Sequence, residues 1–538
     1  MVDISGKAKS LHGLWWVLGG AFLARLALAL ANLQTLLALS IPDDAFYYFK
    51  IAENIASGRG STFDGLHPTN GYHPLWMGFL IPLFRVFPGS PELAVTLALV
   101  EQACLDVATA IFVYLLAQAM LSDRTWAILA CALYSFNPHT VFYAIDGMET
   151  ALSTLLAVVV LYVYLSLQSS ATSTLRARVR FATACGLLLL ARTDNIFLCA
   201  LLFTVLAARE WKQHATLRKT FGMGVIVAVF LAPWLAWSYA RFHQFVQVSA
   251  LARPWVLRQK LGGGWILSGL QLLSRELTVQ WPTLSCLLAG YFIVLGISWF
   301  LLRRPGTKPE VGEKGLGMLS LAWAALFITV AFHCFARLYV RPWYSALFLV
   351  LNALTIAWAS KRISRLPGAR GGVAVLMGIL FAAYVVQATG TIWTKTYPWQ
   401  AEMARAADWI NLHTSPKARI GAFNAGIIGF FSHRTVLNLD GVVNNSAYEA
   451  LRAHRLHDYL VANSVDYVAD FKYSVEVDYA DFWGGSRGRT GLAPVPGFPR
   501  GGEEWEATLM QVYEVRESPA APASRSGPQG VPPTLEDR

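Results

Sequence analysis

Two adjacent aspartates, Asp43 and Asp44, follow directly after Pro42 at the end of the first long apolar segment. Neighbouring carboxylates at the exit of a membrane helix suit a general base, a ligand for a divalent metal, or both. Because two like charges this close raise the pKa of one carboxyl group, one of them is suited to accept a proton near neutral pH. Helix capping is the alternative, since aspartate is a common N-cap residue.

The segment that follows, GRGSTFDGLHPTNGYHPLW, is rich in glycine and holds several polar side chains. Irregular loops of this kind frequently form binding surfaces. The spacing of the two histidines matches no standard pair of zinc ligands, so turn-forming and capping roles are the alternative. We predict that four residues of this loop bind substrate: Asp64, His67, Asn70 and His73.

A second pair of acids, Asp146 and Glu149, lies in the sequence DGMET between two apolar segments. We expect this turn on the same side of the membrane as Asp43 and predict that both acids bind substrate. Their spacing is also that of a capping box, and capping and binding are compatible. A divalent metal, Mg²⁺ or Mn²⁺, is compatible with these acids without being required, and its candidate ligands are Asp43, Asp44, Asp146 and Glu149.

Basic residues form the third group of candidates. A guanidinium group binds phosphate oxygens in a fork and stays charged, as a phosphate-bearing lipid substrate would require. Contact with lipid headgroups is the alternative for each of them. The basic residues expected on the outer side are Arg192, Arg253, Arg258, Lys260, Arg337 and Arg341. Among these we predict that Arg192, Arg253, Arg337 and Arg341 bind substrate, together with Asp194 of the sequence ARTDN.

The composition of the 538 residues indicates the kind of fold that holds these candidate residues. Apolar and aromatic residues make up 55% and charged residues only 14%, which is typical of a polytopic membrane protein. Before Thr394 there are 30 Lys and Arg against 16 Asp and Glu, and after it 14 against 17, so the net charge of +11 belongs to the membrane part. Basic loops beside membrane helices set topology, and nucleic acid is not an expected partner.

Hydropathy and the basic clusters predict about eleven membrane helices in residues 1–393, with the N-terminus in the cytoplasm. The stretch 181–208 separates two basic clusters, so we expect two short helices there that turn back at Arg192 and Asp194. The loop 41–91 is expected outside, with residues 74–87 lying in the membrane interface. The predicted helices are 14–40, 92–121, 125–145, 149–168, 181–193, 195–208, 220–241, 283–302, 315–336, 342–360 and 371–391.

Residues 394–517 are predicted to form a small extracytoplasmic α/β domain. ARIGAF, TVLNLD, VDYVADF and LMQVYEV read as strands, and QAEMARAADWINLH and YEALRAHRLHDYLV read as helices. Residues 518–538 are rich in Pro, Ser and Gly, and we expect disorder there.

Several motifs resemble those of bacterial GT-C glycosyltransferases, the polytopic enzymes that include protein O-mannosyltransferases, the lipid A aminoarabinose transferase and mycobacterial arabinofuranosyltransferases. The first loop, DDAFYYFKIAENIASGRGSTFDGLHPTNGYHPLW, carries most of the resemblance. Further matches are DGMETAL, LLARTDN, APWLAWSYARF, RPWYSAL and NAGIIGFFSHRTVLNLDGVVNN, so the resemblance covers residues from about 15 to 470.

The resemblance implies a transferase in the bacterial inner membrane that moves a sugar from a polyprenyl-phosphate donor to a periplasmic glycan, lipid or protein acceptor. It places the catalytic base at Asp43 or Asp44 without deciding between them, and adds Tyr344 and Asp440 to the substrate-binding residues. We predict Asp43 as the base, with Asp44 as a coordinating or orienting partner. Direct displacement would invert the anomeric centre. The alternatives are a transporter or flippase, and a polymerase or ligase of lipid-linked glycans. We find no repeated halves of the kind that many transporters show.

Overall fold

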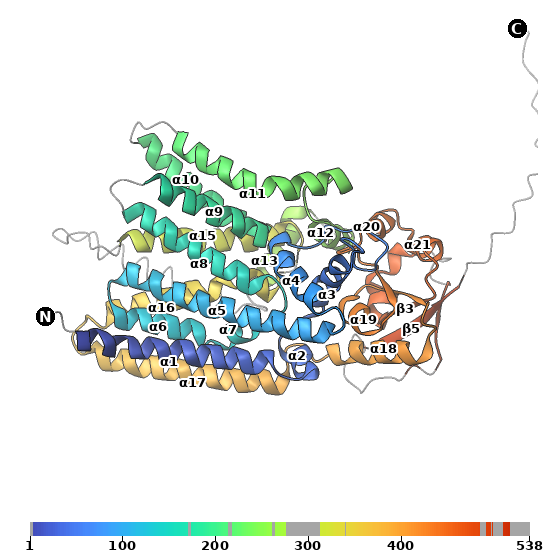
Figure 1. The fold of residues 1–538 in the computed structure, drawn as a ribbon, viewed down its shortest axis with the longest axis horizontal. Coiled ribbons are helices and arrows are strands. Elements are labelled where there is room, and N and C mark those ends of the chain that lie inside the picture. Colours follow the sequence, from blue (N-terminus) through green and yellow to red (C-terminus); the bar gives the residue numbers. More distant parts are fainter. Residues whose placement is uncertain are drawn as a thin grey trace, which may run out of the picture.

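The structure is a computed structural model that describes residues 4–169, 174–212, 218–260, 264–275, 313–338, 340–484, 491–496, 498 and 509–516. A helical bundle forms one end of the molecule and a mixed α/β domain forms the other, with α3 and α4 between them (Figure 1). The predicted helix 283–302 and the tail 518–538 lie outside the described residues.

Six helices among the described residues are long and apolar enough to cross a membrane. They are α1 (Ile4–Ala29), α5 (Pro91–Leu121), α8 (Thr150–Ser169), α11 (Arg218–Phe242), α15 (Glu313–Phe335) and α17 (Ala369–Thr394). Shorter bundle helices are α6 (Arg124–Ser135), α7 (Pro138–Tyr143), α9 (Leu175–Ala191), α10 (Ile196–Lys212) and α16 (Leu347–Ile363). The chain is therefore a multi-pass membrane protein, as predicted.

Two predicted segments divide in the structure. The segment 14–40 separates into α1 and α2 (Leu33–Leu39), and 125–145 separates into α6 and α7 just before Pro138. Proline has no N–H to continue a helix, so it begins α7 at the first turn. The reversal predicted within 181–208 is confirmed, because α9 and α10 are joined by the short helix η1 (Thr193–Asn195).

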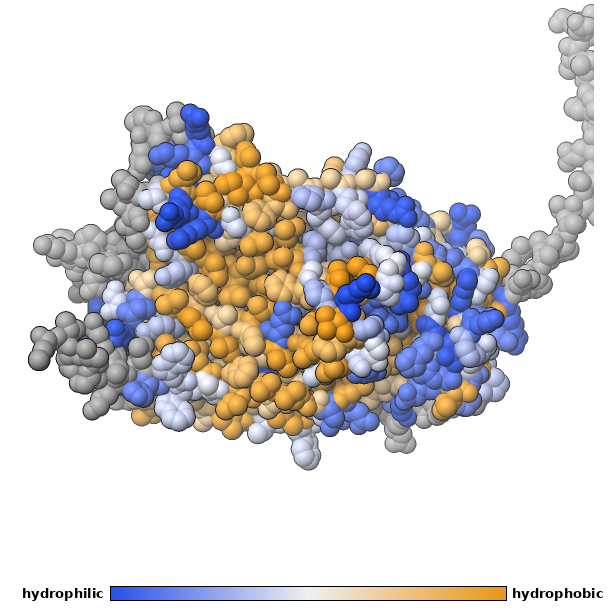
Figure 2. All heavy atoms as spheres, viewed as in Figure 1, coloured by the Kyte–Doolittle hydropathy of each residue, from blue (hydrophilic) through white to orange (hydrophobic). Residues whose placement is uncertain are grey.

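The bundle presents apolar side chains to its surroundings, as a membrane-facing surface requires. Only 6% of the residues in the most apolar stretch of α11, and of α17, are buried. The exposed residues of these helices include Val229, Val375 and Val386. Figure 2 shows this apolar surface on the bundle and a polar surface on the α/β domain. Inside the bundle, Arg25 and Asp106 form a buried ion pair with 2.5 Å between Nε and Oδ2, which satisfies two charges that would otherwise be costly there.

Two helices and a loop connect the bundle to the α/β domain. Helix α3 spans Asp43–Ala56 and α4 spans Pro74–Val86. The predicted interfacial segment 74–87 thus forms an apolar helix of 13 residues, which is too short to cross the membrane, as expected. Further along the chain, α12 (Ser249–Lys260) and α13 (Trp265–Arg275) lie near the same end of the bundle (Figure 1). The short helix η3 (Pro342–Ser345) directly precedes α16.

The α/β domain contains a five-stranded sheet of order β2-β1-β3-β5-β4. Strands β1 (Arg419–Ala422), β2 (Thr435–Asn438) and β3 (Tyr467–Phe471) are parallel, with Arg419 opposite Thr435 and Ile420 opposite Tyr467. Strands β4 (Leu492–Pro494) and β5 (Met510–Val515) are antiparallel. The four predicted strands are confirmed and β4 was not predicted. The helices are α18 (Gln400–His413), α19 (Gly426–Phe431), α20 (Asn445–Arg452) and α21 (Leu456–Ala462), followed by η4 (Ser474–Asp478) and η5 (Ala480–Phe482).

One continuous hydrophobic core joins α3 and α4 to the α/β domain. Phe46 of α3 packs against Phe430 and Phe431 of α19, with ring centroids 5.4 and 5.3 Å apart. Gly71 and Gly426 lie in this contact region, and a Cβ atom on either would lie 2.1 Å from a backbone oxygen of the opposite surface. The two surfaces are therefore in direct backbone contact, which fixes the first turn of α3.

Candidate functional site

The first turn of α3 gives its two aspartates different surroundings. Asp43 accepts hydrogen bonds from the backbone N–H groups of Ile427 at 2.6 Å and Gly426 at 3.2 Å, so it caps the N-terminus of α19. Its own N–H donates to Oε1 of Gln400 at 2.6 Å. Burial raises the pKa of Asp43 to about 7, against the opposing effect of the Ile427 hydrogen bond. Both carboxylate oxygens of Asp43 are thus engaged in joining the bundle to the α/β domain.

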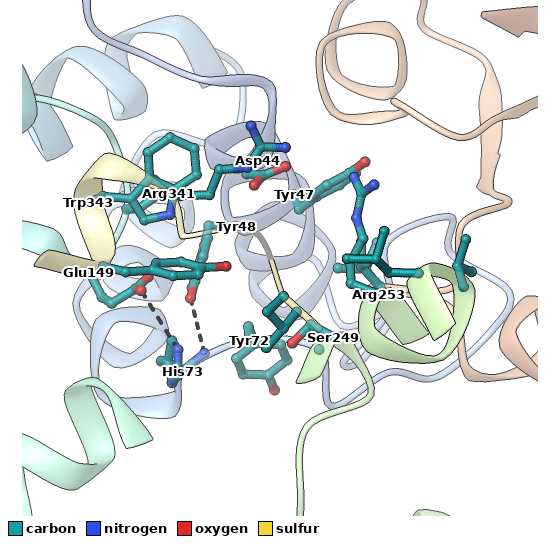
Figure 3. Close-up of a pocket in the computed structure, with 18 of the residues that line it drawn as sticks. Asp44, Tyr47, Tyr48, Tyr72, His73, Glu149, Ser249, Arg253, Arg341 and Trp343 are labelled. Carbon is teal, nitrogen blue, oxygen red and sulfur yellow. Dashed lines mark hydrogen bonds and ion pairs between the residues drawn. The ribbon is translucent and has the colours of Figure 1, made fainter. Parts of the chain in front are cut away.

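Asp44 instead lines a cavity between the bundle and the α/β domain. Among the described residues, no hydrogen bond or ion pair of its carboxylate is found. Its charge acts on Arg253 and on Tyr344, both of which line the same cavity. Figure 3 shows Asp44 at the start of α3 with the side chain of Arg341 directed toward it. Asp44 is therefore the member of the pair whose oxygens are available to a bound molecule.

The cavity has a volume of about 280 Å³ and is lined by α3, the first loop, the turns before α8 and after α9, α12, the segment before α16 and the α/β domain. Aromatic and charged side chains dominate the wall. The aromatic residues are Tyr47, Tyr48, Tyr72, Trp343, Tyr344 and Tyr479, and the charged residues are Asp44, Glu149, Arg192, Arg253, Lys260, Arg337, Arg341 and Asp478. Five cations and three carboxylates give the wall an excess of positive charge, which suits an anionic ligand.

Four of the five cations in the cavity wall come from α12 and from the segment before α16. Nη2 of Arg253 lies 3.1 Å from Oδ2 of the buried Asp440, which ties α12 to the end of β2. Nζ of Lys260 lies 2.8 Å from Oδ1 of Asp478. Arg341 is exposed, stands over the Trp343 ring at 6.0 Å and forms no ion pair within the described part of the chain. Arg337 donates to the carbonyl oxygen of Arg258 at 3.3 Å, and Arg258 itself does not line the cavity.

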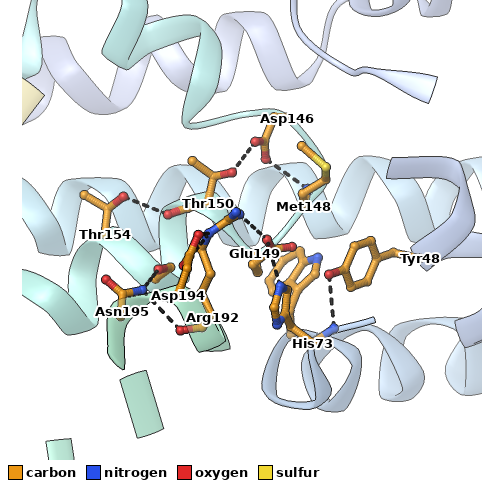
Figure 4. A network of polar contacts seen from close by, with 12 residues as sticks. Tyr48, His73, Asp146, Met148, Glu149, Thr150, Thr154, Arg192, Asp194 and Asn195 are labelled. Carbon is orange, nitrogen blue, oxygen red and sulfur yellow. Dashed lines mark hydrogen bonds and ion pairs between the residues drawn. The ribbon is translucent and has the colours of Figure 1, made fainter. Parts of the chain in front are cut away.

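The fifth cation, Arg192, is held in a buried network at the bundle end of the cavity (Figure 4). Its Nη1 lies 2.6 Å from Oε1 of Glu149, and its Nε donates to both oxygens of Asp194 at 3.0 Å. Nε2 of His73 lies 3.7 Å from the same oxygen of Glu149. Burial lowers the pKa of His73, so the imidazole is neutral near pH 7. The sequence motifs ARTDN and DGMET are therefore in contact, as expected if both turns lie on the same side of the membrane.

The remaining predicted residues of the first loop maintain its shape and do not line the cavity. Asp64 accepts from the N–H of His67 at 2.7 Å, and its Oδ2 lies 2.7 Å from Nδ1 of the same residue. This pairing raises the pKa of His67. Asn70 is buried and accepts from the N–H of Val248 at 3.1 Å while its amide donates to Ser238 at 2.8 Å, so it fixes the loop to the connection between α11 and α12.

Asp146 also has a local role in the structure. Its Oδ1 accepts from the N–H of Met148 at 2.9 Å and from Nε2 of Gln102 at 3.2 Å, and Oδ2 accepts from the hydroxyl of Thr150. Burial raises the pKa of Asp146 to about 7. These contacts match the capping interpretation of the sequence, with the acid fixing the turn before α8.

The four carboxylates considered as metal ligands do not form one cluster. Within the described residues, no group of three or more His, Cys, Asp or Glu side chains is arranged to hold a metal ion. Asp43 and Asp146 instead accept hydrogen bonds from α19 and from the turn before α8. We therefore assign no step to a metal.

Several residues at the site were not predicted. Gln400 is buried and donates from Nε2 to the carbonyl oxygens of Leu37 at 2.6 Å and Ile41 at 2.8 Å, which holds the turn before α3. No sequence pattern distinguishes this glutamine from others. The hydroxyl of Tyr47 accepts from the N–H of Ala425 at 3.1 Å. Its position four residues after Asp43 indicates a shared helix face, which could have singled it out.

Comparison with known proteins agrees with the fold. Residues 391–519 match a family described as a domain of unknown function (DUF8728). No curated protein sequence matches the chain. Among solved structures, ArnT from Cupriavidus metallidurans bound to undecaprenyl phosphate is 13% identical, with a TM-score of 0.57 over 96% of this chain and 100% of that one.

The same ArnT in the apo state has a TM-score of 0.53 at 12% identity, covering 93% of this chain and 97% of that one. The apo oligosaccharyltransferase from Archaeoglobus fulgidus has a TM-score of 0.50 at 14% identity, covering 88% of this chain and 71% of that one. The chain is thus a membrane protein with the GT-C glycosyltransferase fold, and the resemblance seen in the sequence is confirmed at the level of the fold. Its structural similarity to ArnT extends over nearly the whole chain.

Proposed function

We propose that the protein transfers a sugar from a polyprenyl-phosphate donor to an acceptor hydroxyl in the cavity, on the extracytoplasmic side of the bacterial inner membrane. The observation that carries this proposal is the combination of one uncommitted carboxylate, Asp44, with a set of cations in one cavity at the end of the bundle. A carboxylate supplies a base, and guanidinium groups stabilise the negative charge of a departing phosphate. ArnT, which has a similar fold, was solved bound to undecaprenyl phosphate, a lipid phosphate of the kind proposed here.

In the proposed reaction, the oxygen of the acceptor hydroxyl attacks the anomeric carbon while Asp44 accepts the proton of that hydroxyl. The bond between that carbon and the phosphate oxygen breaks, and the polyprenyl phosphate leaves with the electron pair. Arg253, Arg341 and neighbouring cations stabilise the phosphate. A single displacement inverts the anomeric configuration. The pKa of Asp43, about 7, would suit a base at neutral pH, but geometry takes precedence, because the oxygens of Asp43 already bind α19.

Replacing Arg341 tests the phosphate contact. The purified protein is supplied with a panel of radiolabelled polyprenyl-phosphate sugars and membrane acceptors. We expect transfer by the wild type, and for Arg341→Gln an increase in donor KM of about tenfold, because a charge-assisted hydrogen bond to phosphate is lost. Arg452→Gln, on the exposed surface of α20, is the matched control and should leave KM unchanged. Absence of transfer from every donor would reject the proposed function.

The orientation in the membrane has its own test. The end of α8 and the end of α10 meet through Gln168 and Arg209, and Arg178 at the start of α9 pairs with Glu210, so these basic ends cluster together. They lie at the end of the bundle away from the α/β domain (Figure 1), and clustered Lys and Arg mark the cytoplasmic side. We therefore expect the α/β domain outside the cytoplasm.

Single cysteines at two exposed positions check this orientation in intact cells. Leu412→Cys in α18 should react with a membrane-impermeant maleimide, whereas Leu366→Cys, between α16 and α17, should react only after permeabilisation. Labelling in the opposite pattern would place the cavity on the cytoplasmic side. The unsubstituted protein provides the background from its native cysteines.

A further inference from the structure

One oxygen of Glu149 is buried in the cavity wall without a hydrogen-bond donor. Oε1 is bound by Arg192, but Oε2 has no partner within the part of the chain that the structure describes. The residue is only 3% exposed. A buried carboxylate oxygen without a donor is costly, because it has lost its hydration and gained no hydrogen bond in return. The cavity therefore presents a preformed acceptor to a donor group of a bound molecule.

Polar and aromatic groups surround this acceptor. The hydroxyl of Tyr48 accepts from the N–H of His73 at 3.2 Å (Figure 3), and burial together with the nearby Glu149 carboxylate raises the pKa of Tyr48 well above its usual value. On the other side, the ring of Tyr344 covers Arg192, with 4.3 Å between the guanidinium carbon and the ring centroid. Such a wall of flat rings with a few fixed polar groups is typical of a small-molecule site.

The charges of the cavity are separated along its length. At the bundle end one cation, Arg192, is shared by two carboxylates, Glu149 and Asp194, which leaves a local excess of negative charge. The other four cations of the wall come from α12 and from the segment before α16. A ligand that is anionic at one end and rich in hydrogen-bond donors at the other fits this distribution.

We propose that Oε2 of Glu149 accepts a hydrogen bond from a hydroxyl group of the sugar carried on the lipid phosphate, and that Glu149 thereby selects which sugar is bound. This inference rests on the proposed function, because it assumes a sugar phosphate in the cavity. It assigns the bundle end of the cavity to the sugar ring and the end beside α12 to the phosphate. Glu149 acts in this assignment as a binding residue with no part in proton transfer.

The substitution Glu149→Gln tests the contact with little change of shape. To keep an oxygen on Arg192, the glutamine must turn its amide nitrogen toward the cavity, which replaces an acceptor by a donor. The measurement is equilibrium binding of two probes to purified protein: undecaprenyl phosphate, and undecaprenyl-phosphate sugars in a panel of hexoses and pentoses. We expect Glu149→Gln to bind the preferred sugar-bearing lipid about tenfold more weakly, and to bind the bare lipid phosphate as the wild type does.

Asp194→Asn is the matched control, because Asp194 also binds Arg192 but does not line the cavity. It should leave the ratio of the two affinities unchanged. Equal weakening of both probes in Glu149→Gln would assign Glu149 a structural role, and no weakening would mean that water alone occupies the site. Either result overturns the inference. The proposed function fails separately, if the wild type binds these lipids but transfers no sugar from them.

Discussion

The substitution Asp44→Asn is expected to reduce sugar transfer by about 10²–10⁴-fold, the usual contribution of a general base. Asparagine keeps the size of the side chain and cannot accept the proton. Because Asp44 forms no hydrogen bond or ion pair among the described residues and lies on the cavity wall, its loss should leave the fold intact. The measurement is the initial rate of transfer at saturating donor, together with the thermal stability of the variant.

Asp43→Asn is the matched control, since the two residues are adjacent and of the same type. An asparagine oxygen replaces only one of the two acceptors that bind Ile427 and Gly426. We therefore expect a clear loss of thermal stability and a smaller loss of rate than in Asp44→Asn. If Asp43→Asn abolishes transfer in a stable protein while Asp44→Asn remains active, the base is Asp43 and the assignment made from the cavity is wrong.

The sequence predicted which motifs would meet, because hydropathy and charge place helix ends on one side of a membrane or the other. The turns at Glu149 and Arg192 follow from that rule, and the structure brings them to 2.6 Å. Four of the five strands of the α/β domain were equally predictable from short apolar runs between turns, and only β4 was missed. These features depend on local patterns, which a single sequence contains.

The roles of Asp43 and Asp44 could not be distinguished in the same way. Both lie in the first turn of α3, and their difference is made by α19, which is almost four hundred residues further along the chain. Asp64 and His67 looked like binding residues because of their types, yet they pair with one another. A residue type shows what chemistry is available, whereas the partner that uses it is set by tertiary contacts.

The second large effect is expected at the contact between α3 and the α/β domain. A Cβ atom at Gly426 would lie 2.1 Å from the backbone oxygen of Asp43 and 2.9 Å from its Oδ1. Neither backbone can yield without breaking the hydrogen bonds of Asp43 to α19. We expect Gly426→Ala to lower the free energy of unfolding by about 1–3 kcal/mol, the usual cost of overpacking, and to reduce transfer because the first turn of α3 moves.

Gly71→Ala should have the same effect from the other side of the contact, since its Cβ atom would lie 2.1 Å from the backbone oxygen of Val442. Gly378→Ala in α17 is the control, because no atom lies within 4 Å of the added carbon, and alanine favours a helix. Denaturation midpoints and transfer rates of the three variants are compared. Stability and activity that are unchanged in both Gly426→Ala and Gly71→Ala would mean that the two surfaces are not in backbone contact. The α/β domain would then have no part in placing Asp44.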